Sequence, residues 1–140
     1  MDALKRITER VCRLGHPDAA GTPTPLLTIG EFFDGNNHVG SIGCNLESGP
    51  APSRFYELFT RFAARPEVKD IRIQITMFDD PDWPFSDTVY IMTSARPETV
   101  ATWFDDDLKP DEVGEGFIEG QKYEPYSVPT GTHVVCCWWD

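Results

Sequence analysis

Apolar residues recur at a helical period at the start of the chain. Within residues 3–14 they follow one another every three or four positions, and Gly15 comes directly after the last of them. This spacing places them on one face of an amphipathic helix that ends at the glycine. The residues on this face are Leu4, Ile7, Val11 and Leu14.

Two more helices are predicted in the first half of the chain. Thr28, followed three residues later by Glu31, forms a capping-box pattern that predicts a short helix over residues 29–34. A second apolar stripe begins after Ser53 and stops at Pro66, a residue that cannot continue a helix. That stripe consists of Phe55, Leu58, Phe59 and Phe62.

Strand patterns follow in the second half. Apolar and polar residues alternate over residues 71–78, and a partner strand over residues 88–93 would complete a hairpin. Ser94 is a candidate cap for one further helix. The chain closes on residues 133–139, which are apolar on both faces, as is typical of a strand in the interior of a sheet.

The order of these elements predicts the fold class. We expect one α+β domain over residues 1–140, with a mainly antiparallel sheet of three to five strands packed against about three helices. Residues 105–131 are acidic and rich in Gly and Pro, so we expect a loop there, with one helical turn at residues 110–113. A chain of 140 residues is long enough for one core and too short for two large domains.

Charge is distributed unevenly between the two halves of the chain. Residues 1–70 hold nine acidic and eight basic residues, whereas residues 71–140 hold 14 acidic and four basic ones. The formal net charge of −11 would repel phosphates, so we expect no sequence-independent binding to nucleic acid. The asymmetry favours a docking surface for a basic protein, and the alternative is that the acidic loops serve solubility alone.

Two acidic stretches would form that surface. The first, residues 79–87, interleaves carboxylates with two aromatic side chains, an arrangement typical of interface anchors. The alternative for these two aromatic side chains is that they pack on the core. The second stretch is residues 105–115. The candidate partner-binding residues are Asp79, Asp80, Asp82, Trp83, Phe85, Asp87, Asp105, Asp106, Asp107, Asp111, Glu112 and Glu115.

A Gly- and Asn-rich loop at residues 35–46 is the alternative site. It contains a cysteine, a histidine and an asparagine, which is the residue set of a thiol hydrolase. The sequence shows no rigid element that would bring these side chains together, and the GSIG segment lacks the lysine of a phosphate-binding loop. An enzyme or a small-ligand pocket is therefore the second hypothesis. Its lining residues would be Asn36, His38, Ser41, Cys44 and Asn45.

Other chemistry is less well supported by the sequence. The DDPD segment at residues 79–82 offers oxygen ligands but lacks the pattern of a calcium loop, and Cys136 and Cys137 would point to opposite faces of a strand. We therefore expect no metal, no cofactor, and free thiols in a cytoplasmic protein. The chain shows neither a secretory signal nor an apolar run long enough to span a membrane.

Three blocks of the sequence resemble a family of small uncharacterised bacterial cytoplasmic proteins. The blocks are EFFDGNNHVGSIGCNL at residues 31–46, WPFSDTVYIMTSA at residues 83–95, and Trp-Trp-Asp at residues 138–140. They carry no known catalytic motif. In size and charge the chain is also similar to immunity proteins, which neutralise a toxin made by the same or a neighbouring cell.

These observations favour a non-catalytic cytoplasmic interaction protein of the immunity or inhibitor type. It would bind a basic protein partner through its acidic surface and occlude the active site of that partner. The alternatives are an enzyme or small-ligand binder that uses residues 35–46, and a structural or regulatory subunit. Such a subunit would form a homodimer through Trp138 and Trp139.

Overall fold

The computed structural model describes residues 2–140, and five strands in this range form one sheet. The strands are β1 (Leu26–Leu27), β2 (Val68–Gln74), β3 (Thr88–Thr93), β4 (Glu112–Glu115) and β5 (His133–Trp138). Their order across the sheet is β1-β2-β3-β5-β4, and every neighbouring pair is antiparallel. The predicted α+β class with an antiparallel sheet is confirmed.

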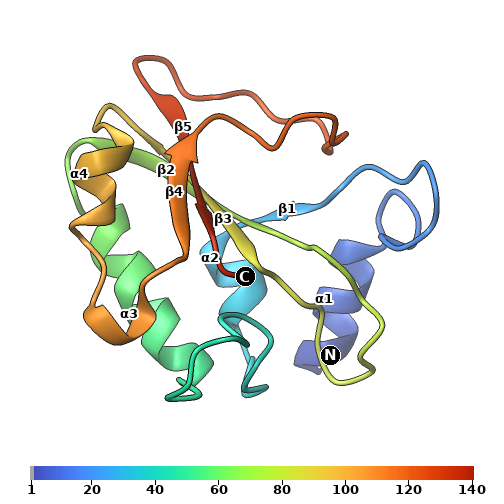
Figure 1. The fold of residues 1–140 in the computed structure, drawn as a ribbon. Coiled ribbons are helices and arrows are strands. Elements are labelled where there is room, and N and C mark those ends of the chain that lie inside the picture. Colours follow the sequence, from blue (N-terminus) through green and yellow to red (C-terminus); the bar gives the residue numbers. More distant parts are fainter. Residues whose placement is uncertain (1) are drawn as a thin grey trace.

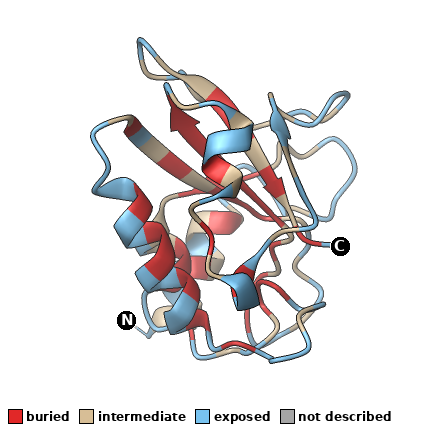
Figure 2. Cartoon of the chain, turned by 60° about the vertical axis from the view of Figure 1, so that its left-hand side comes forward, coloured by how far each residue is buried: buried red, intermediate tan, exposed pale blue. Residues whose placement is uncertain are grey.

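Four α-helices and one short 3-10 helix accompany the sheet within residues 2–140. They are α1 (Ala3–Val11), α2 (Ile29–Phe33), α3 (Pro52–Ala63), α4 (Pro97–Ala101) and η1 (Asp106–Leu108). Figure 1 shows how they are arranged around the strands, and Figure 2 shows that the helices bury one side and expose the other. None of the described helices combines the length and the apolar character that crossing a membrane requires.

Local capping explains where the first two helices begin. Asp2 accepts a hydrogen bond from the backbone N–H of Lys5 at 2.8 Å, which satisfies a free amide of α1. The predicted capping box at α2 is present. The Thr28 hydroxyl accepts from the Glu31 amide at 3.1 Å, and the Glu31 carboxylate accepts from the Thr28 amide at 2.9 Å.

The two faces of the sheet bury different groups of side chains. One face carries alternate residues of the strands, including Ile73, Val89 and Cys137, and packs against the aromatic side chains of α3. The other face carries Leu26, Tyr90, Met92 and Val134, and is covered by the connection between β4 and β5. The covering side chains are Phe117, Tyr123 and Tyr126. Both faces are therefore shielded, which explains why every residue of β3 is buried.

The structure corrects several local predictions. Helix α1 ends at Val11 and not at Gly15, and the N-cap of α4 is Arg96 and not Ser94. The first long strand spans Val68–Gln74, so it begins and ends earlier than the alternation over residues 71–78 predicts. The helical turn expected at residues 110–113 is wrong, because Glu112–Glu115 form strand β4. The physical reason is that β5, apolar on both faces, lies inside the sheet and takes β4 as its second hydrogen-bonded neighbour.

Candidate functional site at the acidic end of the sheet

Most of the predicted acidic residues gather at one end of the sheet. At this end β2 stops at Gln74 and β3 starts at Thr88 opposite it, while β5 stops at Trp138 opposite both Thr88 and Glu112. Three segments therefore lie at this same end of the sheet (Figure 1): the connection from β2 to β3, the start of β4 and the C-terminal residue. We call this region the acidic end. It comprises Asp79, Asp80, Asp82, Asp87, Asp111, Glu112 and Asp140.

The Gly- and Asn-rich loop lies at the same end and contacts both acidic stretches. The His38 imidazole Nε2 is 3.2 Å from a carboxylate oxygen of Asp80. The Ser86 amide donates to the carbonyl of Ser41 at 2.8 Å. Further along the loop, the Asn45 side-chain amide donates to Asp111 at 2.9 Å. The predicted acidic surface and the alternative site at residues 35–46 therefore form one continuous region.

Buried contacts hold this loop in place. Asn36 is buried, and its side chain donates to the Ser41 hydroxyl at 3.0 Å and accepts from the His38 amide at 3.0 Å. Gly43 has a φ of +65°, and a Cβ there would lie 2.6 Å from Cζ of the buried Phe55 ring. The close approach to Phe55 and the left-handed backbone both require glycine at this position.

The catalytic arrangement considered for this loop is not formed. Both ring nitrogens of His38 face carboxylates, Nε2 toward Asp80 at 3.2 Å and Nδ1 toward Asp82 at 4.0 Å. Cys44 is exposed and forms no hydrogen bond with His38 among residues 2–140. A thiol hydrolase needs its histidine to act on the cysteine, so the observed pairing does not support that chemistry.

His38, Asp80 and Asp82 together have the donor set of a cation site. One atom from each residue lies within 4.8 Å of the others, and all three side chains are at least partly exposed. Asp80 also accepts the Asp82 amide at 2.7 Å, which is the local turn expected of such a segment. The sequence of residues 79–82 displays only the carboxylates, because the distant His38 reaches them through the fold.

The second acidic stretch is partly neutralised by α3. Arg54 donates to Asp107 at 2.8 Å, and Arg61 donates to Asp105 at 2.7 Å. The Arg54 guanidinium holds the pKa of the Asp107 carboxyl below its usual range. Lys109 pairs with Asp106 at 3.1 Å. The carboxylates at residues 105–107 are therefore matched by cations of the same chain.

The anchor role expected for Trp83 is wrong. Its side chain is only 4% exposed, and its indole N–H donates to the Phe32 carbonyl at 3.2 Å. Phe85 is half-buried, and its backbone amide donates to the carbonyl of Met77 at 2.8 Å. Trp83 thus packs on the core, which is the alternative that the sequence left open.

The remaining predicted residues, Asp87 and Glu115, differ in their hydrogen bonds and exposure. The Asp87 carboxylate accepts from the hydroxyls of Thr76 at 2.6 Å and Thr88 at 2.9 Å. Burial, together with the carboxylates of Asp87 and Glu112, raises the pKa of Cys136 to about 11, so this thiol stays protonated at neutral pH. Glu115 is exposed on β4, on the side away from the acidic end.

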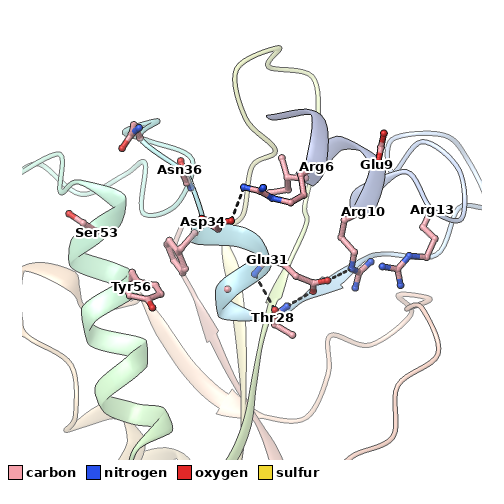
Figure 3. A pocket seen from close by; sticks show the side chains of 15 residues that line it. Arg6, Glu9, Arg10, Arg13, Thr28, Glu31, Asp34, Asn36, Ser53 and Tyr56 are labelled. Carbon is pink, nitrogen blue, oxygen red and sulfur yellow. Dashed lines mark hydrogen bonds and ion pairs between the residues drawn. The ribbon is translucent and has the colours of Figure 1, made fainter. Parts of the chain in front are cut away.

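A separate pocket opens between α1, α2 and the start of α3 (Figure 3). Its volume is about 1130 Å³, and of the predicted site residues only Asn36 lines it. One wall carries Arg6, Arg10 and Arg13, which are not among the predicted site residues. Their helical spacing is the signal that could have identified this wall.

Arg10 connects that wall to the rest of the fold through several contacts. Its side chain is largely buried and contacts Glu31 at 2.9 Å and Glu124 at 3.0 Å, as well as the Leu26 carbonyl at 3.2 Å. Glu124 also accepts the Leu26 amide at 2.6 Å. Burial alone would raise the pKa of Glu31, but the Thr28 amide and the Arg10 charge outweigh it and lower that pKa.

Comparisons with known proteins place the chain in a family. It matches the uncharacterized protein YfbO family over residues 2–137. The uncharacterized protein YfbO of Escherichia coli (strain K12) is 44% identical over 140 residues, and the alignment covers all of both chains. No solved structure matches the chain. The resemblance to a small uncharacterised bacterial family is confirmed, and the chain belongs to the YfbO family.

Proposed function

We propose that this chain is a non-catalytic interaction protein that binds a basic protein partner through the acidic end of the sheet. The observation that carries the proposal is the set of carboxylates left without a cation. Asp79, Asp82 and Glu112 are exposed, and no Lys or Arg nitrogen within residues 2–140 lies within 4.0 Å of their oxygens. The arginines of α3 are already paired with Asp105 and Asp107.

Apolar side chains among these carboxylates support a protein partner. Val39 of the Gly- and Asn-rich loop is 55% exposed, and Met77 of the connection from β2 to β3 is 40% exposed. An apolar contact surrounded by charges is the usual composition of a protein interface. Val39 and Met77 thus replace Trp83 as the apolar contacts of the proposed interface.

The compartment and the immunity or inhibitor role are part of the same proposal. All four cysteines are free, which suits the reducing cytoplasm. The net charge of −11 favours fast, salt-sensitive association with a basic protein, as a toxin neutraliser requires. The bound chain would occlude the active site of its partner.

The test is affinity capture from a lysate of the native host with three versions of the protein. The first is the wild type, and the second carries Asp79→Asn, Asp82→Asn and Glu112→Gln. The third is a matched control with Glu9→Gln, Glu57→Gln and Glu98→Gln, three exposed carboxylates outside the acidic end. The second and third versions have equal net charge, so they separate a defined surface from general electrostatic attraction.

We expect one basic protein to be retained by the wild type and by the control, and to be lost with the acidic-end variant. Retention should be strong at low salt and weaker at about 0.15 M salt, where the Debye length is about 8 Å. Equal retention by all three versions would contradict the proposal, as would a capture with no specific protein.

A further inference from the structure

The geometry points to a second binding site: we propose that the pocket between α1, α2 and α3 binds a small anionic molecule that carries a planar apolar group. This inference goes beyond the proposed function and does not depend on it. The pocket lies next to the acidic end but shares none of its carboxylates. Its volume of about 1130 Å³ is sufficient for a small ligand.

A row of arginines forms one wall of the pocket. Arg6 and Arg10 lie one helical turn apart on α1. Arg13 lies two residues after the last residue of this helix. Figure 3 shows the guanidinium groups of Arg10 and Arg13 pointing toward the same region, and the acidic side chains of Glu9, Glu31 and Asp34 also line the pocket. Three of the 12 basic residues of a strongly acidic chain thus line one wall.

Two of these arginines are available to a ligand. Arg13 is exposed, and no carboxylate within residues 2–140 lies within 4.0 Å of its guanidinium. Arg6 pairs with Asp34 at 2.7 Å, but the side chains are 51% and 66% exposed, and an ion pair of this kind exchanges readily. Arg10 is held by Glu31 and Glu124 and supports the wall. A bound phosphate or carboxylate would take its hydrogen bonds from Arg13, or from Arg6 in place of Asp34, because Figure 3 shows these two guanidinium groups pointing in different directions.

The opposite wall is aromatic. Tyr56 of α3 is 45% exposed, and its ring contacts Phe33 edge to face, with ring centroids 6.0 Å apart. Both residues line the pocket, so a planar apolar group can pack against them. Gly30 lies between the two walls, and a Cβ there would meet only the Thr28 hydroxyl at 4.0 Å. The absent side chain at Gly30 keeps the middle of the pocket open.

NMR titration of the full-length protein tests the proposal with three probes. Phenyl phosphate has both required groups, inorganic phosphate has only the anion, and benzylamine has the ring with a positive charge. We expect phenyl phosphate to shift the amide signals of Gly30 and Tyr56 and the Nε–H signal of Arg13. Inorganic phosphate should bind more weakly because it lacks the ring, and benzylamine should cause no shifts at these sites.

Three variants distinguish the pocket from nonspecific binding. Gly30→Gln fills the middle of the pocket and should abolish binding of phenyl phosphate, because Gly30 has ordinary helical backbone and tolerates a side chain. Arg13→Gln should weaken binding about tenfold, as expected for the loss of a charged hydrogen bond. Gly114→Gln is the matched control on β4, where a Cβ meets nothing within 4 Å, and should bind like the wild type.

Several outcomes would overturn the proposal. They are unchanged binding of phenyl phosphate to the Gly30→Gln variant, equal shifts with benzylamine, or no shifts in the pocket with phenyl phosphate. The amide signals of β3 and β5 report on folding in each variant, so a misfolded variant is recognised directly. The acidic-end variant should retain phenyl phosphate binding, which makes failure of this proposal distinguishable from failure of the proposed function.

Discussion

The side-chain amide of Asn45 donates a hydrogen bond to the Asp111 carboxylate at 2.9 Å, between residues 66 positions apart in the sequence. The same Asp111 oxygen accepts the backbone amide of Asp140 at 2.7 Å. One carboxylate therefore joins the Gly- and Asn-rich loop, the segment before β4 and the C-terminal residue. This arrangement makes the acidic end a single region.

The first prediction concerns this junction. Asp111→Ala removes two hydrogen bonds, so we expect the free energy of unfolding to fall by about 1 kcal/mol. Asn45→Ala removes one of them and should cost about 0.5 kcal/mol, because the site is exposed. Urea denaturation of the single and double variants gives the coupling energy directly. Strictly additive effects would show that Asn45 and Asp111 do not interact in solution.

The second prediction concerns Arg10. Replacing it with Gln leaves the largely buried Glu124 carboxylate without its cation, and should lower the free energy of unfolding by about 3 kcal/mol. Arg10→Lys should restore only part of this loss, because an ammonium group cannot contact Glu31, Glu124 and the Leu26 carbonyl together.

Arg6→Gln is the control for Arg10, since it breaks an exposed ion pair on the same helix. This substitution should lower the free energy of unfolding by less than about 0.5 kcal/mol in the same urea measurement. If Arg10→Gln and Arg6→Gln destabilise the protein equally, the bridging role of Arg10 is wrong.

The third prediction is a pH dependence at Glu31. The folded-state pKa of Glu31 is below its ordinary value of 4.5, so the ionised form stabilises the fold above that value. This stabilisation is lost as the pH falls through the folded-state pKa. Glu31→Gln keeps the acceptor of the capping box but removes the charge that contacts Arg10.

At pH 7 we expect the wild type to be more stable than the Glu31→Gln variant by about 0.5 kcal/mol, because the carboxylate is partly exposed to solvent. The difference should approach zero once the pH falls below the folded-state pKa of Glu31. Urea denaturation at several pH values measures it. A difference that stays constant across this range would rule out the charge of Glu31 as its source.

The fourth prediction concerns Gly43. An alanine there would be forced to a φ of +65° with its Cβ 2.6 Å from Cζ of Phe55. Gly43→Ala should therefore lower the free energy of unfolding by about 2 kcal/mol. Gly114→Ala has open space and an ordinary φ, and should change stability by less than about 0.5 kcal/mol. Similar unfolding midpoints for the two variants would contradict the packing of the loop on α3.

The parts of the fold predicted from the sequence depend on neighbouring residues. The capping box of Thr28 and Glu31 involves four consecutive positions, and the stripe from Phe55 to Phe62 repeats within a few turns. Both were confirmed because short-range patterns directly reflect helix geometry. Strand β4 has no such pattern, since its Glu-Val-Gly-Glu sequence becomes a strand only by pairing with β5.

The candidate site depends on long-range contacts, which the sequence does not display. The loop at residues 35–46 and the acidic stretch at residues 79–87 were recognised separately, but the contact of His38 with Asp80 arises only from the fold. The pairing of Asp107 with Arg54 likewise removes a carboxylate from the predicted surface. Trp83 and its acidic neighbours share one segment, yet the indole turns to the core to bond the Phe32 carbonyl.

The most direct test of the account is the affinity of the captured basic protein, measured after purification, for the wild type and the acidic-end variant. Isothermal titration at low salt should show about tenfold or more loss of affinity in the variant, and the charge-matched control should bind like the wild type. The difference in affinity between the acidic-end variant and the wild type should become smaller as the salt concentration rises. Equal dissociation constants for all three proteins at low salt would contradict binding through Asp79, Asp82 and Glu112.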